Sequence, residues 1–280
     1  MPHDPLFDSA WLKWTQAVLH TQALEAAIEA IGSDEDPHPR LTVRTEYHPG
    51  RHGFAVIPEW VESIPVRWRL LLGDVANNYR SSLEHLAWAL VTRGRTPPDK
   101  LNSKARGNIH FPIGQHKNGF NGSLSRNLPG VRRADIAKVR RGQPYRYGTR
   151  NRARHALTFL ADINNGDKHR TIQPIWAQPT KVGMEITHIE DCEQSSPTNR
   201  LKPHALEVGQ EITLIRVRRT GSDPRIVVHP HVVVEPTIGQ RVSIKEWAAQ
   251  CGIFVFRLLG EFSEPPAEIH EVGAELIPWS

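Results

Sequence analysis

Cysteines and long apolar runs are scarce in this sequence, and both absences narrow the kind of protein it encodes. Cys192 and Cys251 are the only cysteines in 280 residues and form no CxxC pair, so the chain offers neither a disulfide framework nor a cysteine-built zinc site. No stretch approaches the roughly 18 consecutive apolar residues of a membrane span. The opening residues, MPHDPLFDSAWLKW, also lack the basic and apolar regions of a secretory signal. We therefore expect a cytoplasmic protein with no membrane partner.

Several catalytic signatures are missing as well. The sequence contains no phosphate-binding glycine-rich loop, no GxSxG and no HExxH, which argues against P-loop, α/β-hydrolase and zinc-protease classes. His229 and His231 lie two positions apart in a predicted strand, where both side chains share a face and could bind one metal ion. Two histidines out of 15 are weak support for such a site, so we predict no metal and no cofactor.

Positive charge is concentrated in one segment. Residues 126–155 contain nine arginines and one lysine against a single acid, Asp135, which gives a formal charge of +9. The whole chain carries +5, so the other 250 residues sum to −4. A mildly acidic protein therefore carries one cationic element, and such a local field attracts polyanions.

The first part of the chain has mainly helical periodicity. Apolar residues at helical spacing predict helices over residues 9–31 and 65–92. Between them, residues 41–57 alternate around a His-Pro-Gly turn and predict a β-hairpin. Residues 94–130 are rich in Gly, Asn, Ser and Pro, and we interpret them as a long surface connection with short ordered pieces.

The later part changes from helix to strand. A helix is predicted over residues 149–164, ending at Asn-Asn-Gly, and another over 243–262. Between them lie β-branched runs typical of strands, at residues 182–190, 211–219 and 225–235. The fold class is therefore predicted as α+β, with a helical domain at residues 1–172 and an antiparallel β region with its closing helix at 173–280.

The predicted helix over 65–92 has two faces. Its apolar residues fall within roughly 80° of arc at about 100° per residue, and they are Leu72, Val75, Tyr79, Leu83, Leu86 and Leu90. A polar stripe lies opposite them, formed by Asp74, Asn78, Ser81 and His85. Compact polar side chains suit a packed interface or a functional site, whereas a plain solvated face usually carries long charged residues. A plain exposed face remains the alternative interpretation.

Three motifs carry a resemblance to a known family. NYRSSLEHLAW at residues 78–88, HFPI at 110–113 and NNGDKHR at 164–170 follow one another along the chain. This order resembles a widespread, poorly characterised bacterial family with an N-x-R-S-x-L-[DE]-H-L-x-W helix, then F-P-I, then D-K-H-R near a helix end. The match covers about residues 65–175 and brings no established activity with it.

A looser resemblance is to HEPN proteins, whose helical ribonucleases carry an Arg followed four to six residues later by His. Arg80 and His85 have this spacing, although Ser81 stands where those nucleases commonly place Asn, Asp or His. The resemblance implies metal-independent RNA cleavage, a candidate endoribonuclease of a toxin or phage-defence kind. His85 would transfer protons and Arg80 would stabilise charge on the phosphate.

Helical geometry adds a condition to that hypothesis. Five residues on a helix separate two side chains by about 140°, so one helix does not easily present Arg80 and His85 to one phosphate. The HEPN resemblance implies a homodimer that supplies two such helices to one cleft. In the alternative interpretation, Arg80 pairs with Glu84 at i,i+4, His85 is a hydrogen-bonded interface residue, and the protein is a non-catalytic nucleic-acid- or protein-binding module.

The third motif supplies two further candidates. Asp167 and His169 follow the predicted helix end at Gly166. An Asp could orient an imidazole for acid–base chemistry, as in many hydrolytic sites. The alternative is a buried hydrogen-bonded corner that fixes the exit of the chain into the β region.

The arginine-rich segment interleaves tyrosines with its cations. Single-stranded nucleic acid is bound by this combination, because Arg contacts phosphates and aromatic rings stack on bases. RNA is therefore the favoured partner, and a solvated basic surface or an acidic protein partner is the alternative. The predicted contacts are Arg140, Arg141, Tyr145, Arg146, Tyr147, Arg150 and Arg154.

Overall fold

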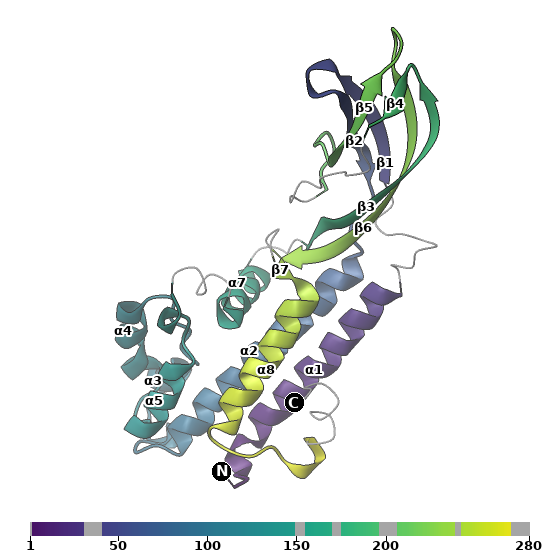
Figure 1. Ribbon diagram of the computed structural model, residues 1–280. Coiled ribbons are helices and arrows are strands. Elements are labelled where there is room, and N and C mark those ends of the chain that lie inside the picture. Colours follow the sequence, from purple (N-terminus) through teal and green to yellow (C-terminus); the bar gives the residue numbers. More distant parts are fainter. Residues whose placement is uncertain are drawn as a thin grey trace. The chain divides into compact units, whose positions relative to one another are not determined.

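The computed structural model has an α+β fold, as the sequence predicts (Figure 1). It describes residues 2–30, 41–148, 155–169, 175–195, 206–238 and 242–269, and of these it gives the backbone alone at 165–169, 176–184 and 230–234. The chain forms two compact units, each assembled from separated segments. The first unit, largely helical, comprises Met1–Glu25, Arg69–Gln173 and Lys245–Ser280, and the second, largely strands, comprises Ala26–Trp68 and Pro174–Ile244.

Long helices form the first unit, and their ranges confirm three predictions. Helix α1 spans Asp8–Glu29, α2 spans Val66–Thr92 and α8 spans Ile244–Gly260. A short 3-10 turn, η1 at Pro5–Phe7, precedes α1 and is capped by the Asp4 side chain. Among the described residues, no helix combines the length and the apolar character needed to cross a membrane.

Aromatic side chains fill the space where α1, α2 and α8 meet. The indole of Trp14 donates a hydrogen bond to the Gly252 carbonyl of α8 at 2.9 Å, and the Trp11 ring packs against Phe256 at 5.2 Å between centroids. The buried hydroxyl of Ser82 on α2 donates to the Ala10 carbonyl of α1 at 2.8 Å. These contacts remove large rings from water and satisfy the indole N–H of Trp14, which fixes how the three helices pack.

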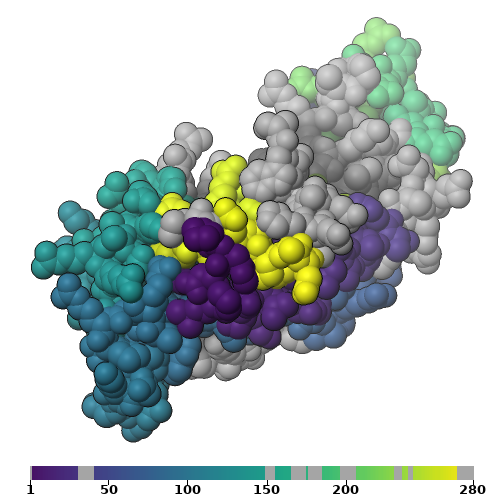
Figure 2. Space-filling view, turned by 90° about the horizontal axis from the view of Figure 1, so that it is seen from below, coloured from purple at the N-terminus to yellow at the C-terminus, as the bar shows by residue number. Residues whose placement is uncertain are grey.

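The residues just before α1 contact the residues just after α8. Phe7 stacks on Phe262 with ring centroids 6.2 Å apart, and the Asp4 backbone N–H donates to the Ser263 hydroxyl at 2.8 Å. Figure 2 shows the purple N-terminal residues lying directly against the yellow residues near the other end of the chain. Pairing between such distant segments closes the helical unit.

Residues 94–130 contain more helix than predicted. Besides the turn η3 at Pro98–Lys100 and the short helix α3 at Ser103–Gly107, helix α4 runs over Lys117–Asn127. Its glycines and asparagines favour loops, which explains the prediction of a connection. Phe120 is fully buried against Tyr145, with ring centroids 5.4 Å apart, and this tertiary contact outweighs the weak helix propensity.

Two further helices complete the first unit. Helix α5 spans Arg133–Arg141 and is followed by the turn η4 at Pro144–Arg146, within the arginine-rich segment. Helix α7 spans Ala156–His169. The prediction that it stops at Gly166 is wrong, because one glycine costs a helix only about 1 kcal/mol and does not by itself end it. The predicted earlier start, over residues 149–154, lies outside the described residues.

The second unit contains two antiparallel sheets, which agree with the predicted hairpin and strands. Hairpin strands β1 (Leu41–His48) and β2 (Gly53–Val61) flank the turn η2 (Pro49–Arg51) and join β5 (Thr213–Arg219) and β4 (Cys192–Gln194) in the order β1-β2-β5-β4. The other sheet has the order β3-β6-β7, with β3 at Ile175–Glu190, β6 at Arg225–Ile238 and β7 at Val242–Ser243. A buried apolar cluster lies between strands of both sheets and includes Phe54, Val56, Ile215, Val217, Ile226 and Val228.

The two units do not correspond to the predicted domains at residues 1–172 and 173–280, because each unit combines segments from both sides of residue 172. The hairpin at 41–57 belongs to the second unit, because β2 pairs with β5 and so satisfies its backbone hydrogen bonds there. Helix α8 belongs to the first unit, because its apolar face packs on α1 through contacts such as Trp14 with Gly252. Both placements depend on contacts between segments far apart in the sequence.

Candidate functional site

Arg80 on α2 is bound to the HFPI motif rather than left free for a substrate. Its guanidinium donates a hydrogen bond to the Phe111 carbonyl oxygen at 3.0 Å and forms an ion pair with Glu84. The backbone N–H of Phe111 is bound as well, because it donates a hydrogen bond to Glu84 Oε2 at 2.8 Å. The i,i+4 pair of the alternative interpretation is therefore confirmed, and the segments 78–88 and 110–113 meet at Phe111.

His85 lies in a different environment on the same helix. It is half-buried, and burial lowers the pKa of its imidazole, with a further lowering by the nearby Lys13 of α1 and an opposing effect of Glu84. Arg80 meanwhile binds Phe111 through a side chain that is only 17% exposed. Within the described chain, Arg80 and His85 thus have different surroundings, and their catalytic pairing across a homodimer stays a prediction.

The polar stripe of α2 has no uniform environment. Asp74 is exposed, Asn78 is buried and Ser81 is half-buried. The Asn78 amide donates to the Asp74 carbonyl at 2.9 Å, so this group is used within its own helix. The stripe is therefore partly structural, and the buried Ser82 beside it makes the contact to α1.

The remaining catalytic and metal candidates lie at the edge of what the structure describes. Asp167 and His169 belong to the last turn of α7, not to a segment after it, and their side chains lie outside the described part. His229 is exposed on β6 and pairs in register with Glu185 of β3, whereas only the backbone of His231 is described. Among the described residues, no group of three His, Cys, Asp or Glu side chains could hold a metal ion.

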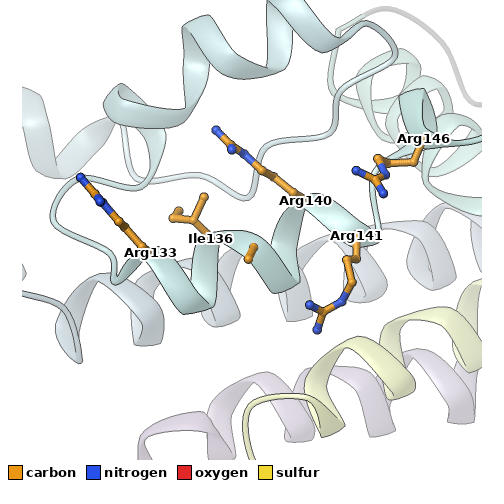
Figure 3. Close-up of a pocket in the computed structure, with 6 residues that line it drawn as sticks. Arg133, Ile136, Arg140, Arg141 and Arg146 are labelled. Carbon is orange, nitrogen blue, oxygen red and sulfur yellow. The ribbon is translucent and has the colours of Figure 1, made fainter.

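Arginines of α5 and η4 line a pocket of about 520 Å³ on the first unit (Figure 3). We call it the arginine pocket, and its lining residues are Arg133, Ile136, Ala137, Arg140, Arg141 and Arg146. The prediction named Arg140, Arg141 and Arg146 but missed Arg133. The signal was present, since seven residues are close to two helical turns and place Arg133 and Arg140 on one face of α5.

Buried contacts hold α5 in place beneath these arginines. Asp135 is buried and pairs with Arg93 at 3.1 Å, and the Arg93 guanidinium lies over the Phe7 ring at 4.8 Å from its centroid. At the end of the helix, the buried Gln143 accepts from the Gly114 N–H at 2.8 Å and donates to the Val139 carbonyl at 3.1 Å. The pocket therefore has a fixed backbone.

The arginines of the pocket differ in how far their charge is balanced. Arg141 points toward the segment after α8 and pairs with Glu261 at 2.6 Å (Figure 3). Arg140 donates to the neutral Asn121 amide at 3.3 Å. Among the described residues, none of Arg133, Arg140 and Arg146 has a carboxylate partner. Within that part of the chain, three of the four guanidinium groups thus keep an uncompensated positive charge.

The two tyrosines of this region have different roles. Tyr145 is half-buried and packs on Phe120, so it supports α4. Tyr147 is 43% exposed and lies 4.8 Å from the His155 ring. Burial lowers the pKa of His155 to about 4, so this ring is neutral at pH 7. Arg150 and Arg154, the other predicted contacts, lie outside the described residues.

Comparison of the chain with protein-family models, with curated proteins and with solved structures finds no match in any of the three. The resemblance to the bacterial family and to HEPN proteins therefore stays a prediction.

Proposed function

We propose that the protein binds RNA and that the arginine pocket is the contact surface for the phosphate backbone. The observation that carries the proposal is the cluster of guanidinium groups at Arg133, Arg140 and Arg146, which have no acid partner in the described part of the chain. Uncompensated arginines cost electrostatic free energy that a polyanion relieves, and their planar fork matches phosphate oxygens. Arg133 thus joins Arg140, Arg141 and Arg146 as an RNA contact.

The geometry of the pocket supports an extended polyanion over a single small anion. Arg133 and Arg140 lie roughly 10 Å apart along the α5 axis at about 1.5 Å per residue. In Figure 3 their side chains extend in the same direction and do not converge. Ile136 lies between them and supplies an apolar floor. Successive phosphates of one strand suit such a row better than one isolated phosphate does.

A binding experiment tests this proposal through its salt dependence. We expect the triple variant Arg133→Gln/Arg140→Gln/Arg146→Gln to bind labelled RNA at least about tenfold more weakly in fluorescence anisotropy. Log affinity falls with log salt by about 0.7 per phosphate contact on a single strand. Loss of three contacts should therefore make this negative slope shallower by about 2, measured between about 50 and 200 mM salt. RNA affinity that is independent of salt, or equal in wild type and variant, would overturn the proposal.

A matched control removes the same charge elsewhere. Arg44, Arg218 and Arg225 are exposed on strands of the second unit and pair with Glu46, Glu193 and Asp223. Their triple substitution by Gln lowers the net charge equally, and we expect RNA affinity within about twofold of wild type. If the true partner is an acidic protein, we expect wild type to bind RNA weakly, and both triple variants to bind it with the same affinity as wild type.

A metal-independent ribonuclease acting as a homodimer is a second proposal, and His85 is what supports it. The lowered pKa of this imidazole favours the neutral form that a general base needs. Arg80 argues against it, because its guanidinium is occupied by Phe111 and Glu84. Incubating wild type and His85→Ala with labelled RNA in EDTA separates the two: cleavage lost in the variant supports the ribonuclease, and binding without cleavage in both supports the RNA-binding module.

A further inference from the structure

Three aromatic rings form a cluster that begins one residue after the arginine pocket. Tyr147 directly follows Arg146, a lining residue of the pocket, and its ring lies 4.8 Å from the ring of His155 at an interplanar angle of 48°. His155 in turn meets Phe254 of α8 edge-on at 5.1 Å and an interplanar angle of 76°. Tyr147 is the exposed ring of this aromatic cluster, at 43% exposure.

Two contacts fix the inner rings of this aromatic cluster, His155 and Phe254. His155 Nδ1 accepts a hydrogen bond from the Leu157 N–H at 3.2 Å at the start of α7, which fixes the orientation of the imidazole. Phe254, on its other side, also lies against Gly142, where an added Cβ would be 2.9 Å from the ring. The outer ring, Tyr147, is in contrast 43% exposed. One side of the Tyr147 ring is therefore supported by His155, and part of its surface is accessible to a ligand.

We propose that Tyr147 is a base-stacking residue that selects single-stranded RNA, with one nucleobase against its ring and the neighbouring phosphates in the arginine pocket. This inference rests on the proposed RNA binding and deepens it. A tyrosine already backed by a fixed aromatic ring loses little conformational freedom on stacking, which leaves more of the stacking free energy for binding.

The same geometry explains why a duplex is disfavoured. In an A-form helix both faces of every internal base are already stacked, and its deep major groove is too narrow for side chains to read. Only an unpaired nucleotide can turn its base onto Tyr147 while its phosphate reaches Arg146. Duplex RNA is then left with phosphate contacts alone. Tyr145 does not serve in this way, because its ring is occupied by Phe120.

The test compares Tyr147→Ala with Tyr147→Phe on three RNA probes. The probes are a short single strand, the same strand with abasic sugars at its central positions, and the corresponding duplex. We expect Tyr147→Ala to weaken binding of the intact single strand about tenfold and to change binding of the abasic strand and of the duplex less than about twofold. Tyr147→Phe keeps the ring and should bind as wild type does.

Two further readouts separate stacking from a change in fold or charge. Tyr147→Leu keeps apolar cover over His155, so it retains the packing but should lose single-strand affinity as Tyr147→Ala does. The salt slope should not change in any Tyr147 variant, since no phosphate contact is removed. The fluorescence of 2-aminopurine placed in the single strand should be quenched when the strand binds wild type, and much less when it binds Tyr147→Leu.

The outcomes distinguish the two levels of the proposal. If wild type binds none of the probes, RNA binding fails and the stacking proposal fails with it. If wild type binds and the arginine variant loses affinity, while Tyr147→Ala and Tyr147→Leu bind the single strand as tightly as wild type, the stacking proposal alone is overturned. Equal affinity of wild type for the intact and abasic strands overturns it in the same way.

Discussion

The guanidinium of Arg80 donates a hydrogen bond to the carbonyl oxygen of Phe111, 31 positions further along the chain. Glu84, one helical turn after Arg80, accepts the N–H of the same residue. Both backbone groups of Phe111 are thus satisfied by charged side chains, and such hydrogen bonds are stronger than neutral ones. This arrangement gives the Arg and Glu of the first motif a structural role in holding the second.

Arg80→Ala should therefore lower stability. Its loss leaves the Phe111 carbonyl without its charged partner and removes the ion pair to Glu84, so we expect a decrease in the free energy of unfolding of about 2 kcal/mol, measured by urea denaturation. Arg133→Ala, on the exposed pocket, should change stability by less than about 0.5 kcal/mol. Unchanged stability of Arg80→Ala combined with lost RNA cleavage would instead return Arg80 to a catalytic role.

Lys13→Gln should raise the pKa of His85. Lys13 lowers this pKa because its positive charge disfavours the imidazolium, so removing the charge favours the protonated form, while the lowering by burial remains. The pKa is measured from the pH dependence of the His85 ring signals in NMR. Lys104→Gln, an exposed substitution on α3, is the control and should leave the His85 titration where it is in wild type.

His155 should make the protein less stable in mild acid. Its pKa is lowered from 6.5 to about 4 by burial, so the folded state binds fewer protons than the unfolded state between these values. The stability contributed by the neutral ring is complete above about pH 6.5 and is lost as the pH falls toward 4. Because the ring is partly exposed and solvent screens the effect, we expect a loss of about 1 kcal/mol between about pH 7 and pH 5.

The measurement compares urea unfolding of wild type and His155→Gln across this pH range. The variant cannot titrate at this position, so its stability should fall less steeply with acidification, even if it is lower at pH 7. Parallel pH profiles of the two proteins would show that His155 is not the group responsible.

Asp135→Asn should destabilise the protein more than loss of an exposed ion pair does. Asp135 is buried beside Arg93, whose side chain is only 17% exposed, so the substitution leaves a largely buried guanidinium without this partner. We expect a loss of about 3 kcal/mol in thermal or urea unfolding. Glu261→Gln breaks the exposed pair with Arg141 on the same helix and should cost at most about 1 kcal/mol. Similar effects of the two would contradict the anchoring role of Asp135.

Local patterns were sufficient to predict the long helices and the hairpin. The stripe from Leu72 to Leu90 repeats at helical spacing, and both ends of it are buried in α2. The alternation around His48 predicted the hairpin, and β1 has the expected burial of alternate residues. In β2, residues 53–58 are all buried, so that strand packs on both faces.

The differences arose where a distant contact decides the outcome. Helix α4 depends on Phe120 meeting Tyr145, and the position of the hairpin depends on β2 meeting β5. The role of Arg80 likewise depends on Phe111, which lies in a different motif of the sequence, 31 positions further along the chain. Arg–His spacing describes a single helix, whereas the hydrogen-bond partners of those side chains come from elsewhere in the chain.

The segmented composition of both units has a consequence for how the protein is made. Trp14 and Gly252, whose hydrogen bond joins α1 to α8, are separated by 238 residues. A ribosome adding about 5–20 residues per second takes on the order of 10 to 50 s to synthesise that interval. During this time the indole rings of α1 lack their contacts with α8. The nascent chain therefore exposes an aromatic surface, which chaperones would have to cover until α8 has been synthesised.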